Sequence, residues 1–193
     1  MTDNFDDIKK LLVFDSEDDF YFCQILKRKK DNAELSSNSH VVKTYYIKSI
    51  EGLELDWGEM KCLADFHNAR VCINLNKRSF ERICYHNLKS ITDHIMNKDF
   101  SGVRKSYNSC CGSFSSETDG KKWIIDIDEK GRFANEVLKT IDTLRPDGNK
   151  LVAILNTKNG VHLITKPFDV QAFKSVYPNI DIHKNNPTIL YIP

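Results

Sequence analysis

Two aspartates spaced two residues apart, Asp126 and Asp128, are the strongest candidates for chemistry in this chain. They end the stretch WIIDID at 123–128, which has the apolar composition of a strand. Alternate strand residues project from one face, which places the two carboxylates about 6–7 Å apart. Such close like charges repel, and a divalent cation such as Mg²⁺ or Mn²⁺ between them removes the repulsion. The alternative is a solvated strand end whose aspartates only start a turn.

A second candidate is the segment TKNGVH, which runs from Thr157 to His162 between two predicted strands. A turn that contains Gly160 exposes backbone N–H groups, and Lys158 and Asn159, together with the threonine, add side-chain donors that can hold phosphate oxygens. The histidine would open the second strand and point at the same anion. The alternative is an ordinary Asn-Gly hairpin turn with a surface lysine and a half-buried histidine.

Two further segments carry candidate residues. Asp181 lies between isoleucines in NIDIH, where an ionised carboxylate needs a partner, and the same cation would be one. Arg78 lies in NLNKRS at a predicted strand-to-helix junction, where a helix N-terminus favours anions. Residues 77–105 also carry seven Lys or Arg against three acidic residues, a modest footprint for phosphate. The alternatives are an exposed edge-strand aspartate and a solvated helix face.

The length and composition of the chain limit the kinds of fold that can position these residues. The chain has 193 residues, of which 40% are hydrophobic, enough for one domain with two lobes. Lys and Arg number 28 against 27 Asp and Glu, a net charge of +1. This balance excludes an acidic tail protein and a polycation that coats nucleic acid by charge alone.

The cysteines and the N-terminus bear on location and on metal binding. Cys84 and His86 with Cys110 and Cys111 match no standard zinc framework, so buried free thiols are the better interpretation. No apolar run approaches the roughly 20 residues of a membrane span. The N-terminal residues MTDNFDDIKK lack a signal-peptide pattern. We therefore expect a cytoplasmic protein without a membrane partner.

Periodicity predicts strands that alternate with helices, and a hairpin lies among them. The predicted helices cover 5–13, 56–67, 79–96, 131–144 and 168–177. The predicted strands cover 20–29, 41–50, 70–76, 123–128, 151–157, 161–165, 179–182 and 188–192. A flexible polar stretch is predicted at 112–122. This pattern favours an α+β fold in which a mixed or antiparallel sheet carries helices on one face.

The order of the motifs resembles the archaeo-eukaryotic primase superfamily. That family includes the primase–polymerases of phages and plasmids and the polymerase domains of bacterial end-joining ligases. Its D-x-D/E strand, S-x-H-type segment and hydrophobic-Asp strand are similar to residues 125–128, 157–162 and 180–188 here. Its N-P-R-S stretch is similar to NLNKRS. The chain departs from the family at Asn159-Gly160, where a serine is common two residues before the histidine, and at Lys77, where proline is common.

The resemblance implies a two-lobed primase-like fold and nucleotidyl transfer. The N-terminal α/β lobe would span 1–110, and an RRM-like C-terminal lobe with the metal motifs would span 120–193. Mg²⁺ or Mn²⁺ would be held by Asp126, Asp128 and Asp181, which with His162 form the expected catalytic set. The nucleotide would be held by Thr157, Lys158, Asn159, Gly160, His162 and Arg78.

Three functions are consistent with these residues. The first is a metal-dependent DNA primase or polymerase of a phage or other mobile element, acting on nucleoside triphosphates and a DNA template, with a helicase or other replication protein as a further partner. The second is a catalytically degenerate primase-like module that binds single-stranded DNA or nucleotide. The third is a metal-dependent nuclease that uses the same carboxylates and histidine.

Overall fold

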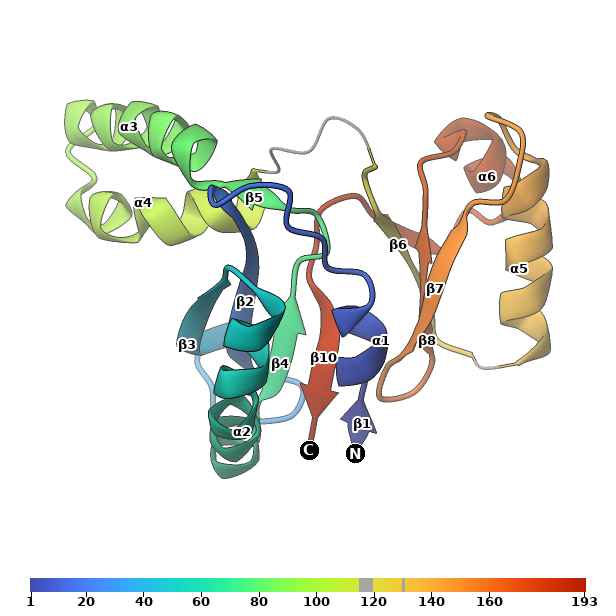
Figure 1. Cartoon of the computed structure of the whole chain (residues 1–193), viewed down its shortest axis with the longest axis horizontal. Coiled ribbons are helices and arrows are strands. Elements are labelled where there is room, and N and C mark those ends of the chain that lie inside the picture. The colour runs from blue at the N-terminus through green and yellow to red at the C-terminus, as the bar shows by residue number, and fades with distance from the viewer. Residues whose placement is uncertain (115–119, 130) are drawn as a thin grey trace.

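Two antiparallel sheets, one in each lobe, form the frame of the protein (Figure 1). The computed structural model describes residues 1–114, 120–129 and 131–193. The strands of the first sheet are β1 (Thr2–Asp3), β2 (Asp19–Arg28), β3 (Ser39–Ile47), β4 (Arg70–Ile73), β5 (Arg78–Ser79) and β10 (Thr188–Ile192). Their order is β1-β10-β4-β2-β3, and β5 pairs with β2.

The second sheet belongs to a unit with the chain order β-α-β-β-α-β. Its strands are β6 (Trp123–Ile127), β7 (Leu151–Asn156), β8 (Val161–Thr165) and β9 (Asp181–His183). Helix α5 (Arg132–Thr143) follows β6, and α6 (Val170–Val176) follows β8. The strand order β7-β8-β6-β9 places the first and third strands of the unit in the centre, which is the split β-α-β-β-α-β arrangement. Both helices lie on one face of the sheet (Figure 1), and the prediction of an α+β fold is confirmed.

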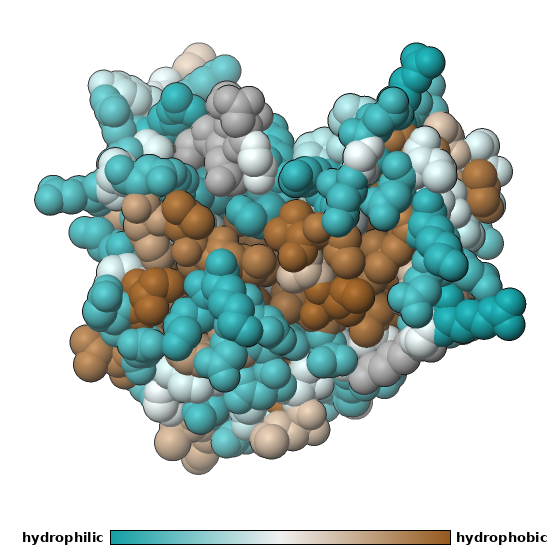
Figure 2. Space-filling model, turned by 45° about the vertical axis from the view of Figure 1, so that its right-hand side comes forward, coloured by the Kyte–Doolittle hydropathy of each residue, from teal (hydrophilic) through white to brown (hydrophobic). Residues whose placement is uncertain are grey.

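The second sheet is covered on both faces because apolar side chains alternate along its central strands. On the helix side Ile125 packs in one cluster with Val137 of α5. On the other side Ile124 and Ile164 join a cluster that also contains Leu190 of the first sheet. Figure 2 shows apolar side chains gathered between the two lobes on the face of the molecule that is turned to the viewer. The lobes therefore share a hydrophobic core, which fixes one sheet against the other.

Four helices belong to the first lobe: α1 (Phe5–Lys9), α2 (Ile50–His67), α3 (Phe80–Met96) and α4 (Phe100–Ser113). Helices α1 and α2 pack into the same core cluster as β2 and β4, with Leu53 and Met60 of α2 fully buried. Helices α3 and α4 form a hairpin that projects from the first lobe, away from the second (Figure 1). Ile83 and Cys111 anchor this hairpin in a small cluster with Phe20 of β2.

The last strand corrects the predicted lobe boundary. β10 lies in the first sheet between β1 and β4, and it pairs Thr188 with Ile73 and Thr2 with Ile192. The C-terminal lobe predicted for 120–193 therefore ends with β9, and the chain returns to the first lobe. Local periodicity identifies 188–192 as a strand but does not say which sheet it joins, because pairing partners are far away in the sequence.

Two local predictions also differ from the structure. Helix α2 begins after Ser49, whose hydroxyl accepts a hydrogen bond from the N–H of Gly52, and not at Asp56. Helix α4 was not predicted, because its residues FSGVRKSYNSCCGS are rich in Ser, Gly and Cys, which are weak helix formers. Of the polar stretch predicted at 112–122, residues 115–119 lie outside the described residues.

Within the described ranges, no helix has the length and apolar character needed to span a bilayer.

Candidate functional site

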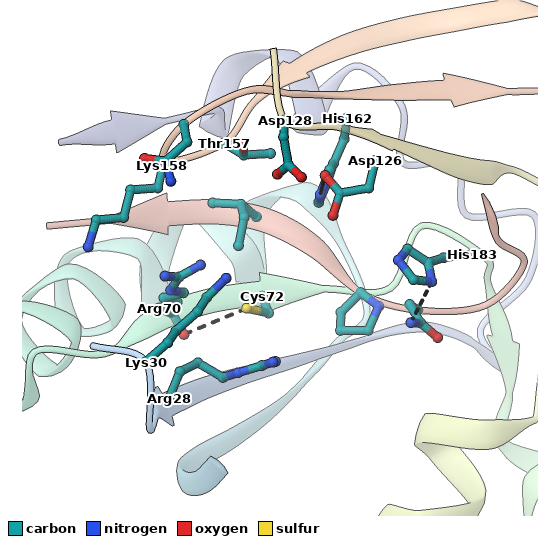
Figure 3. Close-up of a pocket in the computed structure, with 14 residues that line it drawn as sticks. Arg28, Lys30, Arg70, Cys72, Asp126, Asp128, Thr157, Lys158, His162 and His183 are labelled. Carbon is teal, nitrogen blue, oxygen red and sulfur yellow. Dashed lines mark hydrogen bonds and ion pairs between the residues drawn. The ribbon is translucent and has the colours of Figure 1, made fainter. Parts of the chain in front are cut away.

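The two aspartates of the D-x-D pair lie at the end of β6 and line a cavity between the two sheets (Figure 3). The cavity has a volume of about 280 Å³. Asp126 stands directly opposite His162 of β8 in the ladder, and opposed residues of an antiparallel pair project from the same face. Their side chains meet, with 3.5 Å between Oδ1 of the aspartate and Nε2 of the histidine. The structure thus brings Asp126, Asp128 and His162 together at one cavity.

The imidazole of His162 is held from the opposite sheet as well. Its Nδ1 lies 2.8 Å from the hydroxyl oxygen of Thr188, which is fully buried on β10. The histidine itself is only 9% exposed. A ring fixed at both nitrogens by groups from different strands keeps one orientation. When the Thr188 hydroxyl donates to Nδ1, the ring proton is on Nε2, the atom that faces Asp126.

Asp126 is electrostatically suited to stay ionised. The contact with His162 is the largest cause that lowers its pKa below the ordinary value, and the charges of His183 and Lys30 lower the pKa further. Partial burial raises the pKa but is outweighed. An aspartate kept ionised in a half-buried position can bind a cation or accept hydrogen bonds.

Asp181, the third predicted carboxylate, is beside this site but not in it. Its backbone pairs directly with Asp126 across β6 and β9, so the two residues share a face of the sheet. Its side chain is exposed, however, and Asp181 is not among the described residues that line the cavity. His183, two residues further along β9, does line it and lies 3.1 Å from the side-chain nitrogen of Asn186.

The turn between β7 and β8 is built differently from the predicted phosphate cradle. The N–H of Gly160 donates to Thr157 Oγ1 at 3.0 Å, and the N–H of Thr157 donates to the Gly160 carbonyl at 3.0 Å. Gly160 is buried, and a Cβ there would overlap the carbonyl oxygen of Ile127. The glycine thus permits β6 and the turn to approach closely. Thr157, Lys158 and Asn159 line the cavity, whereas Gly160 does not appear in the lining of its described part.

The opposite wall of the cavity is cationic. Arg28 and Lys30 come from the end of β2 and the turn after it, and Arg70 comes from β4 (Figure 3). Asp31 accepts from Arg70 Nε at 2.7 Å and from Lys158 Nζ at 3.0 Å. Partial burial raises the pKa of Asp31, but these two contacts lower it below its ordinary value. Apart from Lys158 of the β7–β8 turn, the site therefore has an acidic wall on the second sheet and a basic wall on the first.

Arg78 does not reach this cavity. The side chain is fully buried, donates to the carbonyls of Asn76 and Cys111, and donates to Asn185 Oδ1 at 3.1 Å. Asn76, two residues earlier, donates to the carbonyls of Lys122 and Lys184, both at 3.0 Å. NLNKRS is thus a clasp that ties the first lobe to the segments entering and leaving the second. Arg78 has no exposed surface to offer a nucleotide, which corrects its predicted position.

The basic excess of residues 77–105 also lies elsewhere. These residues form β5, α3 and the start of α4, and none of them lines the described cavity. Sequence reasoning instead missed Arg28, Lys30, Arg70, Thr188 and His183. The basic run KRKK at 27–30 was visible as the end of a strand, but nothing local shows that it faces Asp126. Thr188 ends the motif stretch 180–188, but nothing local assigns it a role, because a threonine in a strand is ordinary.

The residues present fit one kind of metal site. Among the described residues no group of three His, Cys, Asp or Glu is arranged to hold a metal ion. Mg²⁺, however, is commonly bound by one or two carboxylates together with waters and substrate phosphates, and not by a protein cage. Asp126 and Asp128 supply that pair of oxygen ligands at a cavity whose other wall is basic. The donor set therefore fits a cation that arrives with a phosphate ligand.

Comparisons with known proteins add no assignment. No family model matches the chain, and neither a curated protein nor a solved structure matches it. The geometry of the cavity is therefore the basis for the proposed function.

Proposed function

We propose that the chain is a metal-dependent nucleotidyltransferase of the DNA primase or polymerase type, acting on nucleoside triphosphates and a DNA template. The observation that carries the proposal is the separation of charge in the cavity. Asp126, Asp128 and His162 face it from the second sheet, and Arg28, Lys30 and Arg70 face it from the first. A triphosphate with a bound divalent cation presents positive charge to one wall and negative charge to the other.

The chain's own residues would have distinct tasks. Asp126 and Asp128 would hold Mg²⁺ or Mn²⁺, which supplies neutralisation of the phosphate charge that develops during transfer. His162 can donate from Nε2 to a phosphate oxygen beside Asp126, with Thr188 fixing the ring. Catalysis of this kind depends mainly on positioning and on electrostatic stabilisation. The β-α-β-β-α-β unit also agrees with the RRM-like lobe that the family resemblance implies.

The proposal is tested by template-directed extension of a primer with labelled nucleotides and Mg²⁺ or Mn²⁺. We expect product with the wild-type protein and a loss of at least about 100-fold with Asp126→Asn/Asp128→Asn. Asp147→Asn, at an exposed turn position, is the matched control and should keep full activity. Extension that is unchanged in the double variant would refute the assignment of this site.

A second candidate function is a primase-like module that binds nucleotide or single-stranded DNA without polymerising. The position of Asp181 favours it, because the third predicted carboxylate is exposed and outside the described cavity lining. Binding of template by wild-type protein with no extension under any metal condition would select this function. Metal-dependent shortening of the DNA would instead identify a nuclease.

A further inference from the structure

Two cations of the cavity have no task in the site as predicted from the sequence. Arg28 is the last residue of β2, and Lys30 follows two positions later. Both are exposed, and both line the cavity opposite Asp126 and Asp128 (Figure 3).

The other two cations of the cavity already share one carboxylate, that of Asp31. Asp31 Oδ2 lies 2.6 Å from Arg70 Nη2, and Asp31 Oδ1 lies 3.0 Å from Lys158 Nζ. The Arg70 and Asp31 side chains are 9% and 10% exposed, so this pair is well formed and shielded from water. For Arg28 and Lys30, the described residues contain no acidic side chain within ion-pair distance.

We propose that Arg28 and Lys30 form the phosphate-binding wall of the cavity and hold the polyphosphate tail of the nucleotide. The inference rests on the proposed function. It assigns phosphate binding to residues of the first sheet instead of the β7–β8 turn. The turn is less suited to this task, because the N–H groups of Thr157 and Gly160 are bonded within it. Lys158 is engaged with Asp31 and would contribute only after leaving it.

Charge and size both favour a compact polyphosphate. The described lining has two carboxylates and four cationic side chains, of which Arg70 and Lys158 share Asp31, so a divalent cation on the carboxylates leaves the charges of Arg28 and Lys30 without an acidic partner. A volume of about 280 Å³ suits part of a nucleotide better than a drug-sized apolar ligand, and cationic side chains bind phosphate through charge-assisted hydrogen bonds. Phosphate oxygens also occur in a nucleic-acid backbone, and the experiment separates the two sources.

The test is calorimetric titration of the whole protein with inorganic tripolyphosphate and, separately, with a short oligothymidylate that carries no terminal phosphate. The variants are Arg28→Gln and Lys30→Gln. Lys29→Gln is the matched control, because Lys29 is exposed between the two residues but does not belong to the described cavity lining. We expect each test variant to weaken tripolyphosphate binding at least about tenfold and the control to change it less than about twofold.

Asp126→Asn/Asp128→Asn separates this inference from the proposed function. Without metal, the double variant should bind tripolyphosphate at least as tightly as the wild type, since two repelling carboxylates are gone, even where it extends no primer. Retained Arg28- and Lys30-dependent binding in a protein that never polymerises would refute the function and keep the inference. The inference is overturned if wild-type protein does not bind tripolyphosphate, if all three glutamine variants bind it equally, or if only oligothymidylate binding is lost.

Discussion

Asp126 on β6 and His162 on β8 are directly opposed in one ladder, and the histidine is also held by Thr188 from the other sheet. The imidazole of His162 thus links the acidic wall of the cavity to β10, the last strand of the chain. The geometry of the candidate site therefore depends on how the two lobes pack.

Thr188→Val should destabilise the fold by about 1–3 kcal/mol, because it removes the 2.8 Å partner of the buried Nδ1 of His162. Urea unfolding measures the loss, and nitrogen NMR of the imidazole should show a less uniquely defined tautomer. Thr165→Val is the control on β8, since its buried hydroxyl has no hydrogen-bond partner among the described residues. That variant should be neutral or stabilising by about 1 kcal/mol, so equal losses in both would contradict the prediction.

Asp126→Asn should lower stability most near neutral pH. The fold lowers the pKa of Asp126, so its ionised form stabilises the protein above the unfolded value of about 3.9. This contribution is lost as the pH falls through the lower folded pKa. Unfolding free energies of wild type and variant should therefore converge below about pH 4, as measured by denaturant titration across pH. More than a third of the side chain is exposed, so the difference should be modest.

Repeating these unfolding measurements in a His162→Gln background tests whether the contact with His162 causes the lowered pKa of Asp126. Because the ring contact is the largest cause of the shift, the pH-dependent part of the Asp126→Asn effect should shrink there. A pH-dependent effect of undiminished size would mean that Lys30 and His183 carry the interaction instead.

Gly160→Ala should destabilise the protein by about 2–3 kcal/mol, because a methyl group would overlap the carbonyl of Ile127 and push the turn away from β6. Thermal unfolding measures this loss, and metal titration should show weaker binding, since Asp128 follows Ile127 directly. Gly58→Ala is the matched control at an exposed position of helix α2, where a Cβ meets nothing within 4 Å. It should stabilise by about 0.5–1 kcal/mol, and similar effects of both alanines would contradict the close approach.

Asn76→Ala should loosen the clasp between the lobes. The side chain donates to the carbonyls of Lys122 and Lys184 and accepts from the N–H of Lys122 at 2.7 Å. Losing these buried bonds should cost about 2–3 kcal/mol, with faster amide exchange at Lys122. Asn38→Ala, at an exposed loop position, should change neither quantity. Unchanged exchange at Lys122 would show that other contacts hold the lobes together.

Much of this architecture could be predicted because it depends on local pattern. The alternation in WIIDID places Asp126 and Asp128 on one face opposite Ile125, and Ser79 caps α3 as its position before an apolar-periodic segment predicts. Hydrophobic periodicity likewise identifies α5. These features are decided by residues a few positions apart, whose relation to each other the backbone geometry alone determines.

What faces those residues could not be predicted in this way. Arg28 reaches the same cavity as Asp128, and Thr188 reaches His162, only because β10 returns to the first sheet and the two lobes pack on a shared core. Arg78 was expected at a phosphate and is instead buried in the clasp. By itself, the sequence determined the longer strands, the helices other than α4, and the paired carboxylates. The tertiary structure decided the partners of these carboxylates, because strand order, register and sheet packing arise from contacts between residues that are distant along the chain.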